Sequence, residues 1–315
     1  MSVILRGRIN SMMSNRYSVV MMCTTDTIKS LKNNYKHINE YLKPKSIIVV
    51  ASKKVKNIID EEYPDIQFID EDQLYPQMNL KLIKETISLK IDGDIVPRRA
   101  GWYFQQFLKM AYCTVCEDDE YLIWDSDTVP THYIDFYSEN GKKIFDIKTE
   151  YHKPYFDTMN KLFPMLKKSN DYSFISEHML IEKKIMLELI SKIEQNPDIE
   201  GNVFWEKIIN AIDLKHLGES GFSEFETYGT YVEYFYKDKY EIRKWESLRE
   251  GTAFYKKGVD ENVLRYLSKK YDAVSFEQHD IHIKLQKILS HKVFQNLFVI
   301  NIFQMVKGFL AERIR

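Results

Sequence analysis

Two aspartates one residue apart, Asp125 and Asp127, directly follow the apolar run at residues 121–124. Because a β-strand directs alternate side chains to the same side, both carboxylates can point together at the end of this predicted strand. Adjacent carboxylates repel each other unless a cation lies between them, and an all-oxygen ligand set favours Mg²⁺ or Mn²⁺. The motif therefore predicts a divalent metal site that holds a diphosphate and neutralises its charge as it leaves. The alternative is a solvent-exposed turn.

The elements that must position this motif begin with alternating strands and helices. Short apolar runs predict strands, and apolar residues with helical spacing predict helices. The predicted strands cover residues 17–23, 46–51, 66–69, 121–124 and 143–147. The predicted helices cover residues 27–41, 54–63, 101–116, 154–166, 180–193 and 204–212. This order predicts an α/β fold with a mostly parallel sheet, in which ligands bind beyond the carboxyl ends of the strands.

Three phrases in the sequence make this pattern more specific. They are RRAGWYFQQFLK at residues 98–109, WDSD at residues 124–127 and FSEFETYG at residues 222–229. Together they resemble nucleotide-sugar glycosyltransferases of the GT-A fold, and more closely a bacterial family of capsule and cell-surface polysaccharide glycosyltransferases. The resemblance extends over about residues 17–280, and it implies a Rossmann-like sheet and transfer of a sugar to a polysaccharide or lipid-linked acceptor.

The resemblance also implies a donor site, most simply for a UDP-sugar. Its residues would be Thr24, Thr25, Asp70, Arg99, Gln105, Lys109, Trp124 and Asp125. The first strands would hold the nucleotide, and Arg99 and Lys109 would pair with phosphate oxygens. The alternative for these two cations is surface charge on a solvated helix face. Gln105 and Gln106 are adjacent on a helix, so only one of them can face a sugar.

Sugar transfer with inversion also needs a base for the acceptor hydroxyl. Glu224 and Glu226 lie in an aromatic-rich segment, where a carboxylate gains proton affinity and can accept a proton near neutral pH. The alternative is a pair of solvated acids at the start of a helix. Tyr228 and Trp205 are candidate sugar-stacking platforms, with core packing as the alternative.

A late histidine, His279, is a candidate to complete the metal site formed by Asp125 and Asp127. This assignment follows from the resemblance, because some GT-A enzymes use a late histidine as a metal ligand. The alternative is an unligated surface histidine. The implied cofactor is Mn²⁺ or Mg²⁺.

Composition excludes several other classes. The 315 residues carry 45 basic and 46 acidic side chains, a net charge of −1, so a dedicated duplex-DNA binder is not expected. Of the three cysteines, Cys113 and Cys116 have CxxC spacing but lack a second pair to form a zinc site. We therefore expect buried thiols in a reducing compartment, most simply the cytoplasm.

The last segment, residues 281–315, differs from the rest of the chain. It holds six Lys or Arg residues against one acidic residue, Glu312, interspersed with apolar side chains. This pattern predicts a basic amphipathic helical tail that lies on the inner face of an anionic membrane, or else a helix docked on the core. No apolar run is long enough for a transmembrane helix or a signal peptide.

The predicted organisation has three parts. Residues 1–16 form a flexible N-terminus, residues 17–280 form the GT-A domain, and residues 281–315 form the tail. Within the domain, the nucleotide-binding part covers about residues 17–130 and the acceptor part about residues 131–280. The predicted function is metal-dependent glycosyl transfer. The alternatives are a nucleotidyl- or phosphotransferase with the same paired carboxylates, and a glycan-binding scaffold without turnover.

Overall fold

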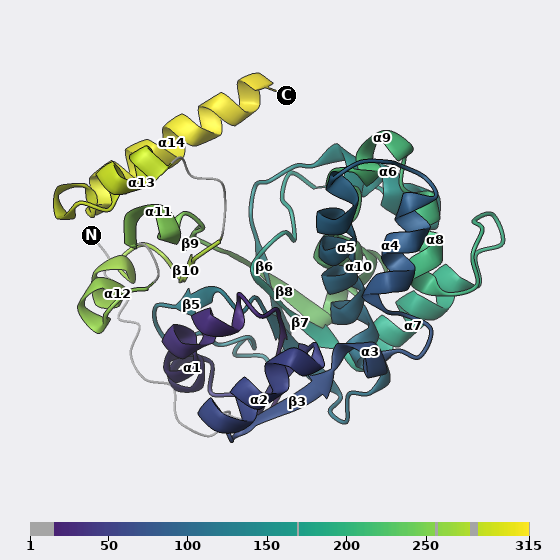
Figure 1. Ribbon diagram of the computed structural model, residues 1–315, viewed down its shortest axis with the longest axis horizontal. Coiled ribbons are helices and arrows are strands. Elements are labelled where there is room, and N and C mark those ends of the chain that lie inside the picture. Colours follow the sequence, from purple (N-terminus) through teal and green to yellow (C-terminus); the bar gives the residue numbers. More distant parts are fainter. Residues whose placement is uncertain (1–15, 169, 256–257, 278–282, 315) are drawn as a thin grey trace.

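The computed structural model describes residues 16–168, 170–255, 258–277 and 283–314 (Figure 1). Of the predicted N-terminal part, only Arg16 falls within these ranges, and the predicted metal ligand His279 lies outside them.

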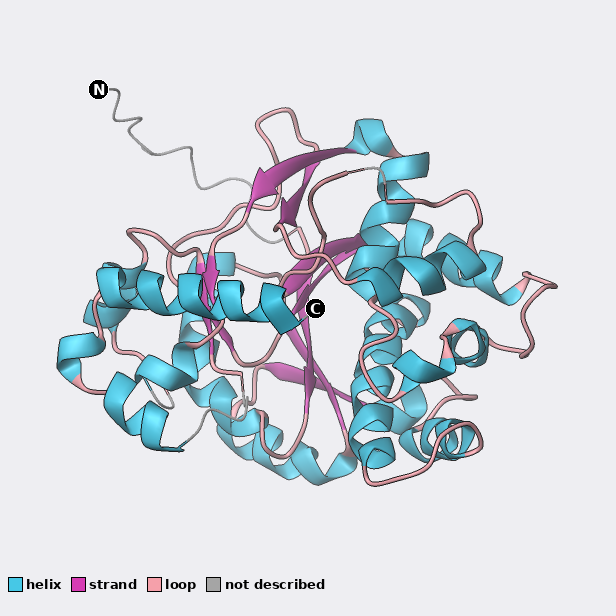
Figure 2. Cartoon of the chain, turned by 90° about the horizontal axis from the view of Figure 1, so that it is seen from above, coloured by secondary structure: helices cyan, strands magenta, loops and turns pink. Residues whose placement is uncertain are grey.

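A central sheet organises the fold. Within the described residues it has five strands in the order β3-β2-β1-β4-β7, and only β7 runs antiparallel to its neighbour. The strands are β1 (Ser18–Cys23), β2 (Ile47–Ala51), β3 (Ile66–Asp70), β4 (Glu120–Trp124) and β7 (His178–Glu182). Helices lie on both sides of the strands (Figure 2). The predicted α/β class with a mostly parallel sheet flanked by helices is therefore confirmed.

The apolar runs form the inner strands because both faces of these strands are covered. All residues of β1 and β2 are buried. Val20 of β1 belongs to the apolar core that includes α5 (Ile95–Ala111), whereas Val19 faces the core that includes α1 (Ile28–Leu42). A strand buried on both faces reads as a continuous apolar run, and the sequence makes such strands recognisable.

The prediction was wrong for residues 180–182, which were assigned to a helix. They belong to β7, and the helix that follows is α7 (Lys183–Glu194). In β7, Leu180 pairs with Leu122 of β4. The apolar run at residues 179–181 is short and leads directly into a helix, so it has no periodicity that separates a strand from a helix. Pairing with β4 therefore decides the outcome.

The remaining helices mostly cover the sheet and its extension. They are α2 (Lys53–Glu62), α3 (Glu71–Leu74), α4 (Leu80–Ser88), α6 (Lys153–Leu162), α8 (Phe204–Ala211), α9 (Leu214–Leu217) and α10 (Glu224–Phe235). Short 3-10 turns cover Tyr112–Thr114, Lys237–Lys239 and Lys292–Phe294. Helix α10 packs against α5, α6 and α7, and this contact brings the third sequence phrase onto the first.

Two small sheets extend from the central one. Strands β6 (Lys143–Ile147) and β8 (Tyr240–Lys244) form a parallel pair. Strands β5 (Thr128–Pro130), β10 (Ala273–Ser275) and β9 (Ser247–Leu248) form the other. Because β5 starts immediately after Asp127 and pairs with β10, the backbone N–H of Phe276 donates to the carbonyl of Asp127 at 2.8 Å. Residues from the end of the chain thereby reach the paired aspartates.

The C-terminal extension is helical, as expected. Helices α11 (Gly251–Tyr255) and α12 (Glu261–Leu267) share an apolar cluster with one face of α14 (Leu297–Ile314), which follows α13 (Ile283–Leu289). In Figure 1 the yellow α14 lies along the margin of the molecule. Its other face exposes apolar side chains at helical spacing, namely Phe298, Ile302, Met305 and Val306. In the part of the chain that the structure describes, no helix is long and apolar enough to span a membrane.

Candidate active site at the carboxyl end of the sheet

The turn after β4 holds the two aspartates in place through its backbone. The N–H of Asp125 donates to the carbonyl of Glu177 at 2.9 Å, and the N–H of Thr128 donates to the carbonyl of Asp125 at 3.0 Å. Ser126 between them is buried, and its carbonyl accepts from Asn34 Nδ2 at 2.6 Å. The turn therefore sits rigidly at the carboxyl end of a central strand, as the motif predicts.

The carboxylate of Asp127 lies in an acidic environment. Burial, followed by the negative charges of Asp125 and Glu277, raises the pKa of Asp127 to about 7. A cation between the two aspartates would relieve both effects. Carboxylate oxygens are the ligands that Mg²⁺ and Mn²⁺ prefer, and these ions take one or two carboxylates together with substrate phosphates. The donor set therefore fits a divalent metal. This set has two protein ligands. Among the described residues, no group of three or more His, Cys, Asp or Glu side chains is arranged to hold a metal.

Lys109 from α5 connects Asp125 to a second carboxylate. Its Nζ lies 2.9 Å from Asp125 Oδ1 and 2.9 Å from Glu224 Oε1. The lysine side chain is only 10% exposed and that of Glu224 4%. Burial would lower the pKa of Lys109, but the two carboxylates overcome this effect and raise it. Lys109 is therefore a buried cation shared by the aspartate turn and the first residue of α10.

The structure separates the two candidate bases. Glu224 faces Lys109 and the aspartate turn, and burial raises its pKa although Lys109 opposes the shift. Glu226 instead accepts hydrogen bonds from Ser173 Oγ at 2.7 Å and from the N–H of Phe174 at 3.0 Å. Its carboxylate therefore holds the segment before β7 against α10. The proposal of a base at the site rests on Glu224 rather than on Glu226.

Close packing explains the glycine in the third phrase. A Cβ atom on Gly229 of α10 would lie 2.3 Å from Cγ of Phe174, so any larger residue would displace this aromatic ring. The contact presses α10 against the segment that Glu226 also binds. Glu224, one and a half turns earlier on the same helix, is thereby held at a defined distance from the sheet.

Two other polar side chains of α5, Gln105 and Arg99, have different surroundings: Gln105 lies on the helix face of Lys109, and Arg99 binds a loop. Gln105 is half-buried and precedes Lys109 by four residues, which places both on one helix face. Arg99 donates from Nε to the carbonyl of Gly218 at 3.0 Å and from Nη1 to Ser220 Oγ at 3.4 Å. Arg99 therefore anchors the loop before α10, and a contact with donor phosphate remains only a prediction.

The predicted nucleotide side lies along the same edge of the sheet. Thr24 and Thr25 are exposed directly after β1. Asp70, the last residue of β3, is 8% exposed, and its Oδ2 lies 3.2 Å from Lys53 Nζ. Because Cys23, Ala51 and Asp70 are in register across three parallel strands, these groups share one edge with Asp125. Contact of this polar edge with a nucleotide remains a prediction.

Glu71 at this edge destabilises the folded state by an amount that depends on pH. Burial, and then Asp72 and Asp70, raise its pKa from 4.5 to about 7. When the pKa of an acid is higher in the folded than in the unfolded state, the free energy of unfolding decreases as the pH rises from 4.5 through 7. We expect Glu71→Gln to raise the free energy of unfolding at pH 8 by about 1–2 kcal/mol, after discounting for partial exposure, and to change nothing at pH 4. Urea unfolding at both pH values checks this, with exposed Glu61→Gln as control; an equal gain at both pH values would contradict it.

Three aromatic residues singled out in the sequence lie in the core. Trp124 is fully buried, donates from Nε1 to the carbonyl of Thr128 at 2.8 Å and stacks on His178 at 5.0 Å. Tyr228 is fully buried, and its hydroxyl accepts from the N–H of Glu182 at 2.8 Å. Trp205 is 2% exposed, and its Nε1 donates to a backbone carbonyl at 3.0 Å. None of these three rings offers a face to a ligand.

Sequence reasoning missed a buried ionic group behind Trp124. Asp146 Oδ2 lies 2.7 Å from His178 Nε2, and Arg243 Nε lies 2.6 Å from Asp146 Oδ1. Burial would raise the pKa of Asp146, but Arg243 and His178 hold it below its usual value. These residues come from β6, β7 and β8, and no local spacing signals that they meet. They fix the ring on which the strand before Asp125 packs.

Comparison with known proteins places the chain in a family. A family model described as a family of unknown function (DUF6492) matches residues 17–257. The chain belongs to this family. The DUF6492 match includes Lys109, the aspartate turn and Glu224, whereas α12, β10 and α14 follow it. No curated protein matches the sequence.

Several solved structures resemble this DUF6492 chain. Mouse xyloside xylosyltransferase 1 is 10% identical with a TM-score of 0.42, over 74% of this chain and 87% of that one. The galactosyltransferase LgtC is 11% identical with a TM-score of 0.41, over 87% and 95%. Core-mannan synthase A of Aspergillus fumigatus, in a form with Mn and GDP, is 9% identical with a TM-score of 0.39, over 74% of each chain. At these values the likeness carries no information on the substrate or metal of this chain.

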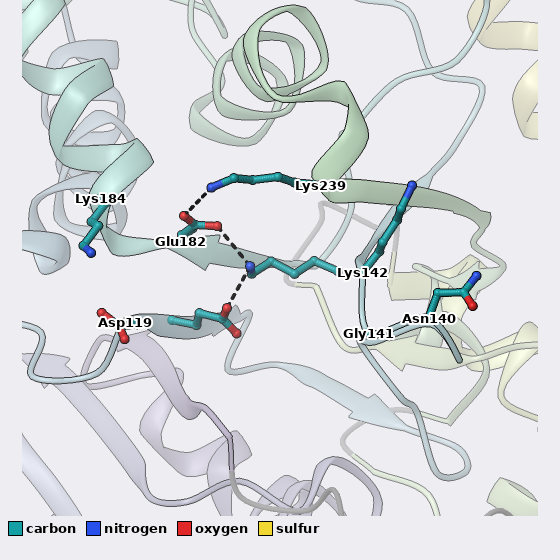
Figure 3. Close-up of a pocket in the computed structure, with 9 residues that line it drawn as sticks. Asp119, Asn140, Gly141, Lys142, Glu182, Lys184 and Lys239 are labelled. Carbon is teal, nitrogen blue, oxygen red and sulfur yellow. Dashed lines mark hydrogen bonds and ion pairs between the residues drawn. The ribbon is translucent and has the colours of Figure 1, made fainter.

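A cavity of the DUF6492 chain, of about 450 Å³, lies at the start of β4, at the end of this strand away from Asp125 (Figure 3). There Glu182 pairs with Lys143 at 3.0 Å and with Lys239 at 2.9 Å, and Lys143 also pairs with Glu120 at 2.8 Å. Because these charges neutralise one another and lie far along the strand from Asp125, this cavity is not the candidate active site.

Proposed function

We propose that the chain transfers a sugar from a nucleotide-diphosphate sugar, most simply a UDP-sugar, to an acceptor hydroxyl with the help of Mn²⁺ or Mg²⁺. One observation carries the proposal. Asp125 and Asp127 stand at the carboxyl end of a central strand of a mostly parallel sheet, beside a buried Lys109–Glu224 pair. Carboxylate oxygens suited to a metal beside a buried carboxylate support this proposal.

The roles follow from the contacts. Asp125 and Asp127 would hold the metal, which would supply positive charge against the departing diphosphate. Lys109 orients Asp125 and Glu224 through its two ion pairs. Glu224 accepts the proton of the acceptor hydroxyl at its carboxylate as the acceptor oxygen bonds to the anomeric carbon. The bond from that carbon to the diphosphate oxygen breaks at the same time.

Thr24, Thr25 and Asp70 would contact the nucleotide, and Gln105 would face the donor sugar from α5. These assignments are supported by their positions along the same sheet edge and on the same helix face as Lys109. Burial raises the pKa of Glu224 while Lys109 opposes the shift, and a raised pKa strengthens this carboxylate as a proton acceptor.

A thermal-shift and product assay tests the proposal. Nucleotide sugars with Mn²⁺ should raise the unfolding temperature of the full chain, since a ligand of the folded state stabilises it by mass action. Slow hydrolysis should release the nucleoside diphosphate. Release of pyrophosphate or nucleoside monophosphate would instead indicate a nucleotidyl- or phosphotransferase. Binding with no product would indicate a scaffold, and no binding would remove the proposal.

The acceptor side of the proposal includes a membrane. The exposed apolar face of α14, with exposed Lys287 and Lys292 nearby, suits an anionic bilayer such as the inner face of a bacterial membrane, where lipid-linked precursors of capsule or other cell-surface polysaccharides would be acceptors. The opposite face of α14 packs on the core through Leu297, Ile300 and Phe303. The prediction of a docked helix therefore describes one face of α14, and membrane contact is proposed for the other face.

Substitution tests this surface better than truncation, because removing the tail would uncover the core that α14 covers. We expect Phe298→Gln with Ile302→Gln and Met305→Gln to reduce binding to phosphatidylglycerol vesicles about tenfold or more, because apolar area no longer enters the bilayer. Vesicle co-sedimentation measures this. Exposed Leu214→Gln on α9 is the control, and unchanged binding of the triple variant would refute membrane contact.

A further inference from the structure

A cavity of about 940 Å³ lies between the end of β6, the segment after β8 and α14, and none of the predicted site residues lines it. Its walls come from the segment after β6, from residues 171–172, from residues 244–250 and from α14. Its volume is about twice that of the cavity at the start of β4, which is about 450 Å³. It is large enough for several sugar rings or a ligand of similar size.

Glu177 connects this cavity to the candidate active site. Its carboxylate pairs with Lys148 Nζ at 2.6 Å and accepts from Ser247 Oγ at 2.8 Å, and both partners line the cavity. Its backbone carbonyl accepts from the N–H of Asp125. On another wall, Arg249 pairs with Glu277. The preceding residue, Phe276, donates its backbone N–H to the carbonyl of Asp127. Residues of the cavity wall are therefore connected to the aspartate turn through Glu177 and through Glu277.

The cations of the cavity are already neutralised. Lys148 pairs with Glu177 at 2.6 Å, and Lys244 pairs with Glu246 at 2.7 Å. Arg249 pairs with Glu277 at 2.6 Å and also with Glu150 at 3.1 Å, and Lys307 pairs with Glu250 at 2.6 Å. An anionic ligand would have to break one of these pairs to gain a counter-ion. Charge therefore favours a neutral ligand.

The remaining groups suit hydroxyls. Glu150 and Asp171 present exposed carboxylate oxygens, which only accept hydrogen bonds and so match O–H donors. The half-buried ring of Tyr172 lies in the same wall, and an aromatic face packs against the C–H face of a sugar ring. Gln304 of α14, whose amide binds Glu250 and Tyr271, also lines the cavity, so the helix that exposes the apolar face closes one side of it.

We propose that this cavity binds neutral sugar residues of the acceptor and rejects uronic or sialic acid residues. The inference rests on the proposed function, and it adds the class of acceptor and the place where it binds. The C-terminal helix contributes to acceptor binding as well as to the apolar surface.

A glycan array with the full chain tests it. The probes are neutral oligosaccharides and oligosaccharides that contain uronic or sialic acids. Thr149→Trp places a large side chain at an exposed position of the cavity wall and should reduce retention of neutral glycans about tenfold or more. Asp171→Lys adds an unpaired cation and should shift retention towards acidic glycans. Asn140→Trp, exposed in the cavity of Figure 3, is the matched control and should behave as the unchanged chain.

Each result decides one of the two proposals. Neutral retention that Thr149→Trp removes and Asn140→Trp keeps supports the cavity. Equal retention by Thr149→Trp, a preference of the unchanged chain for acidic glycans, or no retention at all overturns it. If neutral glycans bind in this way but nucleotide sugars give no thermal shift, the enzymatic proposal fails while the glycan site stands. Unfolding temperatures of all three variants confirm that they fold.

Discussion

Asp127→Asn is expected to abolish the thermal stabilisation that UDP gives in the presence of Mn²⁺ and to lower nucleotide-sugar hydrolysis by about 100-fold or more. The amide has no negative charge, so it binds a divalent cation weakly and leaves the diphosphate charge uncompensated. Asp127 is held by the backbone pairing of β5 with β10, so the substitution should leave the turn in place. Thermal shift and release of the nucleoside diphosphate measure the two effects.

A matched variant separates this effect from general loss of charge. Asp60 on α2 forms an exposed ion pair with Lys56, far along the chain from the turn. Asp60→Asn should therefore bind UDP with Mn²⁺ as the unchanged chain does. The metal assignment would be wrong if Asp127→Asn kept its Mn²⁺-dependent shift, or if the shift in the unchanged chain were the same with EDTA.

Lys109→Met is expected to lower the free energy of unfolding at pH 8 by about 3–5 kcal/mol, because it leaves Glu224 buried without a cation. Without Lys109, the pKa of Glu224 rises further, so the carboxylate takes up a proton at a higher pH than in the unchanged chain and is neutral at acidic pH. The loss of stability should therefore be greatest at pH 8 and smaller at pH 5. Urea unfolding at both pH values measures it.

A double-mutant cycle supplies the control. Glu224→Gln combined with Lys109→Met replaces both charges, so the pair should recover a large part of the stability that Lys109→Met alone loses. Lys36→Met, which breaks an exposed pair with Glu261, should cost no more than about 1 kcal/mol. Additive losses in the Lys109–Glu224 cycle would show that the two groups do not interact.

The sequence predicted the inner strands of the sheet, whose formation depends on neighbouring residues in the chain. β1 and β2 are continuous apolar runs because their two faces are covered by helices, and such runs are visible without a structure. β7 was not predicted as a strand, because its residues lead directly into a helix and only the pairing with β4 identifies them as a strand. The same limit concealed the group formed by Asp146, His178 and Arg243.

The candidate site divides in the same way. Asp125 and Asp127 were recognisable because their spacing and the preceding strand are contiguous in sequence. Lys109 and Glu224 were each singled out, but as a phosphate partner and a base, and their direct ion pair follows only from the packing of α10 on α5. Arg99 and Glu226 carry equally suitable chemical groups, yet in the structure they bind backbone and serine partners that anchor loops.

By itself the sequence predicted the alternation of strands and helices at the start of the chain and the acidic turn that follows a buried strand, since each depends on neighbours within a few residues. Only the tertiary structure decided which carboxylate shares a cation with that turn, which aromatic rings are buried, and where the neutral cavity opens. Those outcomes depend on burial and on charges contributed by distant segments, and the free energies of desolvation and ion pairing have no value until the segments are packed together.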